Sequence, residues 1–130
     1  MNQRNSVSIA LAVMLAAGTT WAHHNMSALF DFNQRFTRTG TLTKSDWRNP
    51  HIQFFLEAKG DKGQAESWLI EGGPPNRFAS RKISKADFEK AIGQTVTVEV
   101  EVSADRDRPR YASLYKITFP DGRVVVNRRP

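Results

Sequence analysis

The chain of 130 residues contains no cysteine, which excludes disulfide bonds and thiolate metal sites. An exported protein of this kind is indifferent to the redox state of its compartment. Long hydrophobic runs are also missing. The apolar segment over residues 7–18 is too short for a membrane-spanning helix, which needs about 20 residues. The chain has room for one small domain, which must hold together through its core alone.

Motifs for covalent catalysis are absent as well. The sequence has no Gly-x-Ser-x-Gly and no histidine beside a plausible activated serine. Asp46, Glu57 and Glu71 fall on different predicted elements, so their spacing marks no acid–base pair. Gly72-Gly73 is followed by two prolines, which donate no backbone N–H, and is therefore a poor phosphate cradle. We expect a non-catalytic protein.

Acidic residues are fewer than basic ones, 13 against 19, which gives a formal net charge of +6. In an exported protein this balance favours anionic lipid head groups, polyanions or small acidic ligands, and makes nucleic acid an unlikely partner. A solvated basic surface that serves only solubility is the alternative.

The N-terminus has the pattern of a secretory signal peptide. Arg4 precedes the apolar run 7–18, and small residues at Thr20 and Ala22 fit a cleavage site after Ala22. We expect residues 1–22 to be removed and residues 23–130 to be periplasmic, without a transmembrane segment. A retained membrane anchor is the alternative.

The remaining chain is predicted to be mainly β. Val96, Val98, Val100 and Val102 alternate with polar residues, the clearest strand pattern in the sequence. Residues 51–58 also alternate, with Ile52, Phe54, Leu56 and Ala58 on one face. Gly40, inside the first strand, suggests a bulge or a sharp coil. Ser84 and Asp87 form a capping pattern, and Gly93 ends the helix that follows. A shorter helical stretch is expected from Asn76. The predicted strands are residues 36–47, 51–58, 65–71, 96–103, 111–119 and 123–127.

Three strands, a helix and two more strands is the order of an OB-fold. We therefore predict a small OB-like five-stranded barrel over residues 36–130, with a helical insert between strands 3 and 4 and a C-terminal β-ribbon. Residues 23–35 are expected to form an extended N-terminal segment. A β-sandwich is the competing fold, but it needs no helix at this position.

Several segments resemble an uncharacterised family of exported bacterial proteins, domain of unknown function 6152 (DUF6152). They are "AHH" and "LFDF" after the predicted signal peptide, "GTLTKSDWRNPHIQFFLE", "WLIEGGPPNRFASR" and "FPDG". The Trp-x-Asn-Pro-His segment, residues 47–51, is the most specific piece. The resemblance implies a small periplasmic β-rich domain and carries no established activity.

The three histidines are the strongest candidates for chemistry. After cleavage, His23 would offer its α-amine and its imidazole to one metal ion, and His51 would be the third nitrogen ligand. An all-nitrogen planar set of this kind favours Cu(II). His24 is an alternative ligand, and Met26 would add a sulfur suited to Cu(I). Copper or another divalent metal is thus the favoured ligand. The bland alternative is a solvated tail and a hydrogen-bonded His51.

A ligand face is predicted on strands 2 and 3, built from Trp47, Asn49, Phe55 and Trp68 around His51. The competing interpretation from another class is an assembly subunit that docks on an envelope protein through Trp47 and Phe55.

A third hypothesis is an anionic-ligand binder that uses Arg77, Arg81 and the arginines of the loop 104–110. Because Asp105 and Asp107 alternate with those loop arginines, we expect a solvated, self-paired loop instead.

Overall fold

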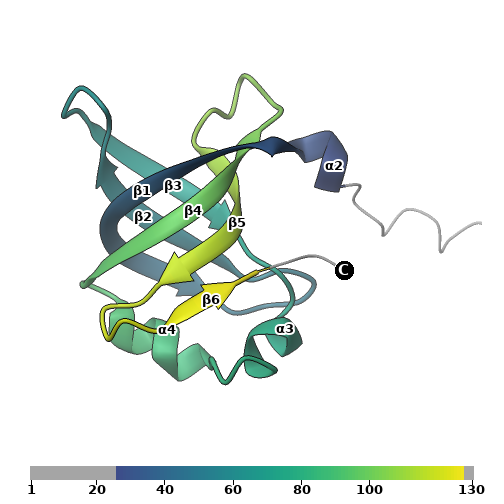
Figure 1. Ribbon diagram of the computed structural model, residues 1–130, viewed down its shortest axis with the longest axis vertical. Coiled ribbons are helices and arrows are strands. Elements are labelled where there is room, and N and C mark those ends of the chain that lie inside the picture. The colour runs from purple at the N-terminus through teal and green to yellow at the C-terminus, as the bar shows by residue number, and fades with distance from the viewer. Residues whose placement is uncertain (1–25, 128–130) are drawn as a thin grey trace, which may run out of the picture.

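One six-stranded β-sheet forms the body of the protein, and two strands that lie far apart in its strand order also pair with each other. The computed structural model describes residues 26–127. The elements are α2 (Met26–Leu29), β1 (Phe30–Asp46), β2 (Gln53–Lys59), β3 (Ala65–Glu71), α3 (Pro75–Ala79), α4 (Lys85–Ala91), β4 (Thr95–Ser103), β5 (Tyr111–Thr118) and β6 (Val124–Val126). The prediction of a mainly β chain is confirmed (Figure 1).

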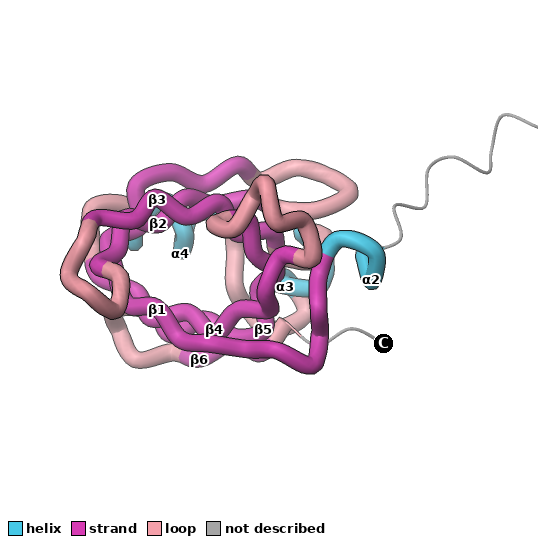
Figure 2. Tube along the Cα trace, turned by 90° about the horizontal axis from the view of Figure 1, so that it is seen from above, coloured by secondary structure: helices cyan, strands magenta, loops and turns pink. Residues whose placement is uncertain are grey.

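The strands follow the order β3-β2-β1-β4-β5-β6, and β3 also pairs with β5 in parallel. This last pairing closes five strands into a ring, which Figure 2 shows end-on with α4 visible through it. All other neighbouring strands are antiparallel. Strand β6 adds an outer ribbon to β5, as the Asp-Gly turn before it suggested.

Strand β1 is long enough to pair with two neighbouring strands. Its first part pairs with β4 and its last part with β2, and Gly40 pairs with both strands. Of the two features expected at Gly40, a bulge or a sharp coil, the bulge is not at Gly40 itself, because the register shift against β2 lies between Leu42 and Lys44. Glycine is required at position 40 for another reason: a Cβ there would lie 2.3 Å from the carbonyl oxygen of Glu57. The first strand also begins at Phe30, six residues earlier than predicted, after the short helix α2.

The interior of the ring is filled by the alternating residues that the sequence indicated. On β2, Phe54 and Leu56 are buried; on β4, Val96, Val98 and Val100 are buried. Their neighbours at odd positions on β2 and β4 are mostly partly exposed. The period of two therefore assigned the faces correctly on β2 and on β4 as far as Val100; at the end of β4 it was wrong, because Glu101 is buried and Val102 is only partly buried.

Helices α3 and α4 lie at one end of the ring, below the strands in Figure 1. Their buried Phe78 and Phe88 pack against each other, and Phe88 also contacts Phe54 and Phe119. This aromatic cluster covers that end with apolar surface. None of the helices over residues 26–127 is long and apolar enough to cross a membrane.

The entry of α4 confirms the predicted capping box. The carboxylate of Asp87 accepts the backbone N–H of Ser84 at 2.8 Å and the guanidinium of Arg123 at 2.7 Å. The Ser84 hydrogen bond and then the Arg123 hydrogen bond lower the pKa of Asp87 to about 2. Gly93, at φ +82°, follows the helix in the left-handed conformation expected of its C-terminal stop. Because Arg123 lies in the turn before β6, its hydrogen bond to Asp87 connects this turn to α4.

Candidate functional site

Two clefts lie on the outer face of β2 and β3, and Arg108 and Tyr111 line both of them. Gln53 and Phe55 on β2 stand opposite Glu71 and Leu69 on β3, on the side of the sheet that faces away from the core. The loop between β1 and β2 and the loop between β4 and β5 border this face. In an OB-fold these elements surround the ligand, so the clefts lie where the predicted fold expects a ligand.

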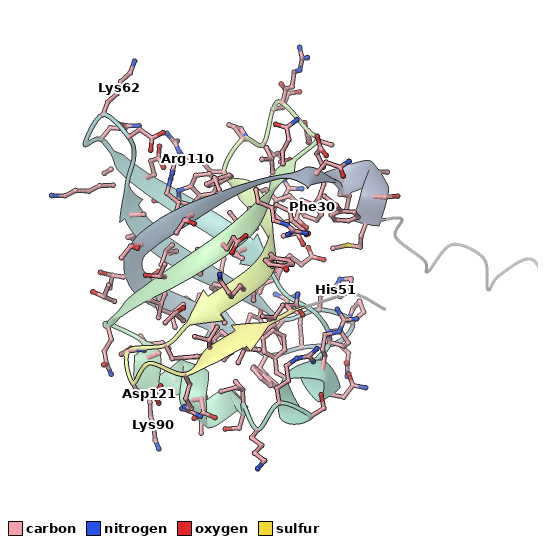
Figure 3. All side chains as sticks on the ribbon, in the orientation of Figure 1. Phe30, His51, Lys62, Lys90, Arg110 and Asp121 are labelled. Carbon is pink, nitrogen blue, oxygen red and sulfur yellow. The ribbon has the colours of Figure 1, made fainter. Side chains whose placement is uncertain are left out.

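The first cleft has a volume of about 470 Å³ and contains His51. Arg48 and Asn49 line it from the loop before β2, Glu71 from the end of β3, and Arg108 from the loop before β5. Of the predicted site residues it therefore brings together His51 and Asn49. Figure 3 shows His51 at the side of the molecule near α3, below Phe30.

A chain of polar contacts holds the histidine. Nδ1 of His51 lies 2.6 Å from Oε1 of Glu71, and the hydroxyl of Tyr111 donates to Oε2 of the same carboxylate. The side chain of Glu71 is 8% exposed and that of His51 is 27% exposed. Nδ1 is thus the ring nitrogen that Glu71 engages, and Nε2 is the ring nitrogen that it does not engage.

The ring of Tyr111 contacts two neighbouring side chains. The ring of Phe30 lies 4.9 Å away, and the guanidinium carbon of Arg108 lies 4.0 Å from the ring centroid. Burial and then the hydrogen bond to the Glu71 carboxylate raise the pKa of Tyr111 above its ordinary value of 10. Tyr111 consequently stays protonated and remains a donor to Glu71 across the physiological range.

The second cleft has a volume of about 360 Å³. Phe55 and Leu69 contribute apolar surface from β2 and β3, and Arg108, Arg110 and Tyr111 line it from the loop before β5 and the start of β5. Figure 3 shows Arg110 toward the β2–β3 hairpin that carries Lys62. Arg108 and Tyr111 line both clefts, so the two share one basic, aromatic wall.

The loop of that wall is not self-paired, contrary to the sequence-based expectation. Over the described residues, Arg106, Arg108 and Arg110 form no ion pair with a carboxylate. Oδ1 of Asp105 instead accepts the backbone N–H of Asp107 at 2.9 Å, a local bond that shapes the loop. The alternation of charges in the sequence did not reveal that the side chain of Asp105 accepts a hydrogen bond from the loop backbone.

The two predicted tryptophans have mainly structural contacts. Trp47 packs edge-on against Phe78 and Phe88, at the end of the ring covered by the helices. Trp68 is buried, packs on Phe36, and donates its indole N–H to Glu66 at 3.0 Å. Trp68 also lines the second cleft. Of the predicted aromatic face, only Phe55 has its outward side chain in a cleft.

Arg77 and Arg81 lie apart from the loop arginines, on α3 and just after it. Arg81 donates to the backbone carbonyl of Arg77 at 2.8 Å, and neither residue lines either cleft. Burial and then the charge of Arg81 lower the pKa of Arg77. A Cβ at Gly73 would lie 3.0 Å from an Arg77 nitrogen, which places the Arg77 side chain against the chain turn before α3.

His23 and His24 lie outside the described residues, so the predicted terminal chelate is not part of this site description. Over residues 26–127, no three histidine or acidic side chains form a group suited to a metal ion. His51 and Glu71 are a pair, and a metal at His51 needs at least one further ligand from elsewhere.

Glu71 and Tyr111 are the residues that sequence reasoning missed. They are 40 positions apart and become neighbours through the parallel pairing of β3 with β5, in which Leu69 stands opposite Tyr111. Spacing in the sequence carries no signal for such a contact. The indication that was present is an acidic residue at a strand end, where the alternation of β3 puts it on the outer face.

Comparison of the chain with known proteins identifies its family. No curated protein and no solved structure gives a significant match. The model of a family of unknown function, DUF6152, matches residues 11–110, which include His51, Glu71 and the whole loop before β5. The resemblance seen in the sequence is therefore confirmed, and the chain belongs to the DUF6152 family.

Proposed function

We propose that this protein is a non-catalytic periplasmic binding domain that holds copper, or another divalent metal, at His51. The fold is an OB-like barrel with its ligand on β2 and β3. Support for this fold comes from the ring order β1-β2-β3-β5-β4 and from the helices between β3 and β4. The metal would be bound in the first cleft.

The observation that carries the proposal is the 2.6 Å contact between Nδ1 of His51 and the carboxylate of Glu71. Metal-binding histidines usually donate their second ring N–H to a carboxylate or a carbonyl, which fixes the ring and raises the basicity of the ligand nitrogen. Here Nδ1 of His51 is held at 2.6 Å by a carboxylate that Tyr111 holds in turn. Nε2 is left as the ligand atom of a partly exposed imidazole beside a cleft.

The remaining ligands would come from the mature N-terminus. Leu29 lines the first cleft, and its carbonyl accepts the backbone N–H of Ala104 at 2.8 Å, which anchors the start of β1 there. His23 precedes Met26 by three residues, a reach of about 10 Å. Cleavage after Ala22 would give His23 a free amine, and that amine with one imidazole forms a chelate. A third nitrogen from His51 makes the set that favours Cu(II).

The experiment compares copper binding by the mature protein with its native terminus, by the same protein with one added N-terminal glycine, and by His51→Ala. Intact mass first establishes that the exported protein is 23–130. Competition titrations and Cu(II) electron paramagnetic resonance then measure affinity and ligand set. We expect His51→Ala to weaken binding about tenfold or more, equivalent to about 1.4 kcal/mol. The added glycine should change the spectrum.

Gln53→Ala is the matched control, because Gln53 lines the same cleft but offers no imidazole. Its copper affinity should stay within about twofold of the parent. Affinity of the parent should drop between pH 8 and pH 5, since amine and imidazole must lose protons to bind. Indistinguishable affinity and spectra for native, glycine-extended and His51→Ala proteins would refute the proposal and favour docking on an envelope protein.

A further inference from the structure

Arg108 and Arg110 are two positions apart on the wall of the second cleft, and neither has a carboxylate partner among the described residues. The guanidinium of Arg108 rests on the Tyr111 ring at 4.0 Å, so it is positioned before any ligand arrives. The buried carboxylate nearby, Glu71, is already engaged by His51 and Tyr111. The charge of Arg108 therefore remains uncompensated.

Part of the lining of this cleft is apolar. Phe55 and Leu69 stand side by side across β2 and β3, and both are partly exposed. The ammonium of Lys44 lies 5.4 Å from the centroid of the Phe55 ring and is a further cation close to this surface. Glu57 is an acidic residue in the same part of the sheet, in register with Ser67, which lines the cleft. Two arginines thus line a cleft that also offers an aromatic and aliphatic surface.

We propose that the second cleft binds a small anion with a flat apolar body, such as an aromatic carboxylate. The ring would lie on Phe55 and Leu69, and the carboxylate would meet the guanidinium groups of Arg108 and Arg110. Arginine suits this task because its planar fork donates two parallel hydrogen bonds to a carboxylate. A cleft of about 360 Å³ is within the range of small-molecule sites. This ligand is independent of a metal at His51.

The test uses 2-naphthoate as the probe and 2-naphthamide as its neutral counterpart. Binding is followed by ¹H–¹⁵N chemical-shift changes on the mature protein without metal, together with probe fluorescence. We expect saturable binding of 2-naphthoate, with the largest shifts at Phe55, Leu69 and Arg110. The amide should bind at least fivefold more weakly. A rise in salt from 50 to 300 mM should also weaken the carboxylate.

Arg110→Gln should reduce 2-naphthoate affinity at least fivefold. Arg106→Gln is the matched control, because Arg106 belongs to the same loop but lines neither cleft, and it should change affinity by less than twofold. Backbone spectra establish that both variants fold. The proposal is overturned by absent or non-saturable binding, by equal affinity for the amide, or by equal losses in the two arginine variants, which would indicate diffuse charge attraction. His51→Ala should leave 2-naphthoate binding intact.

Discussion

Two surfaces of the strand ring, the helical end and the outer face of the sheet, are built on opposite principles. At the helical end, Phe78 and Phe88 are fully buried and contact other rings without any polar partner. On the outer face of β2, β3 and β5, Glu71 and Tyr111 are nearly as buried, yet they are joined by a directed hydrogen bond and bordered by arginines that have no carboxylate partner within residues 26–127. Burial at the first surface stabilises the fold, whereas burial at the second positions chemical groups beside a cleft. Equal burial thus has different consequences for function.

The largest expected effect is at the helical end. Phe88→Ala removes a ring that contacts Trp47, Phe54, Phe78 and Phe119. Replacing a buried phenylalanine by alanine typically lowers the free energy of unfolding by about 3–5 kcal/mol. Urea unfolding followed by circular dichroism measures it.

Ile92→Ala is the control for that change, since Ile92 follows the same helix but is 42% exposed. It should cost about 0.5 kcal/mol or less. Equal losses in the two variants would mean that the aromatic cluster is not the stabilising element of this end.

An intermediate effect is expected where the ribbon meets α4. Asp87→Ala removes the cap of α4 and the partner of Arg123, and should lower the free energy of unfolding by about 1–2 kcal/mol at pH 7. Because folding lowers the pKa of Asp87 from 3.8 to about 2, its stabilisation is present above the unfolded value and is lost as pH falls through the folded one. The difference from the parent should shrink between pH 4 and pH 2 in urea titrations. A constant difference over that interval would contradict the ionised cap.

The smallest effect on stability, about 1 kcal/mol or less, is expected for Glu71→Gln, because glutamine keeps the volume and an acceptor for His51. The same substitution should change the pKa of Tyr111 measurably. Burial and the Glu71 carboxylate together raise the pKa of Tyr111, so removing the negative charge should lower that pKa while burial keeps it above 10. Absorbance at 295 nm in a Tyr115→Phe background, which leaves one of the two tyrosines, measures the shift. An unchanged pKa would mean that Tyr111 and Glu71 are not coupled in solution.

Strand identity and core could be predicted from the sequence because both depend on local periodicity. Phe54 and Val98 were assigned to the core from alternation alone, and both are fully buried. The helix cap at Ser84 and Asp87 was read from residue type and spacing. The start of the first strand was missed by six residues, because Phe30 is buried against Tyr111, a residue that no local pattern connects with it.

The candidate site was predictable only in part. His51, Asn49 and Phe55 were found because they flank a strand that alternation identified. The loop arginines were misjudged because sequence shows only that Asp105 and Asp107 are neighbours, not that Asp105 is used by the loop backbone. Trp47 was assigned to the ligand face, whereas helix packing draws it toward Phe78 and Phe88.

The sequence by itself determined the class of fold, the residues of the core and the family, since each is written in patterns a few residues long. Only the tertiary structure decided which polar groups meet. The parallel pairing of β3 with β5 brings Tyr111 to Glu71 across 40 positions and aims the pair at His51. Contacts between distant strands depend on how the ring closes. Ring closure is a property of the whole packed sheet, so no local pattern records that Nδ1 of His51 meets the carboxylate of Glu71.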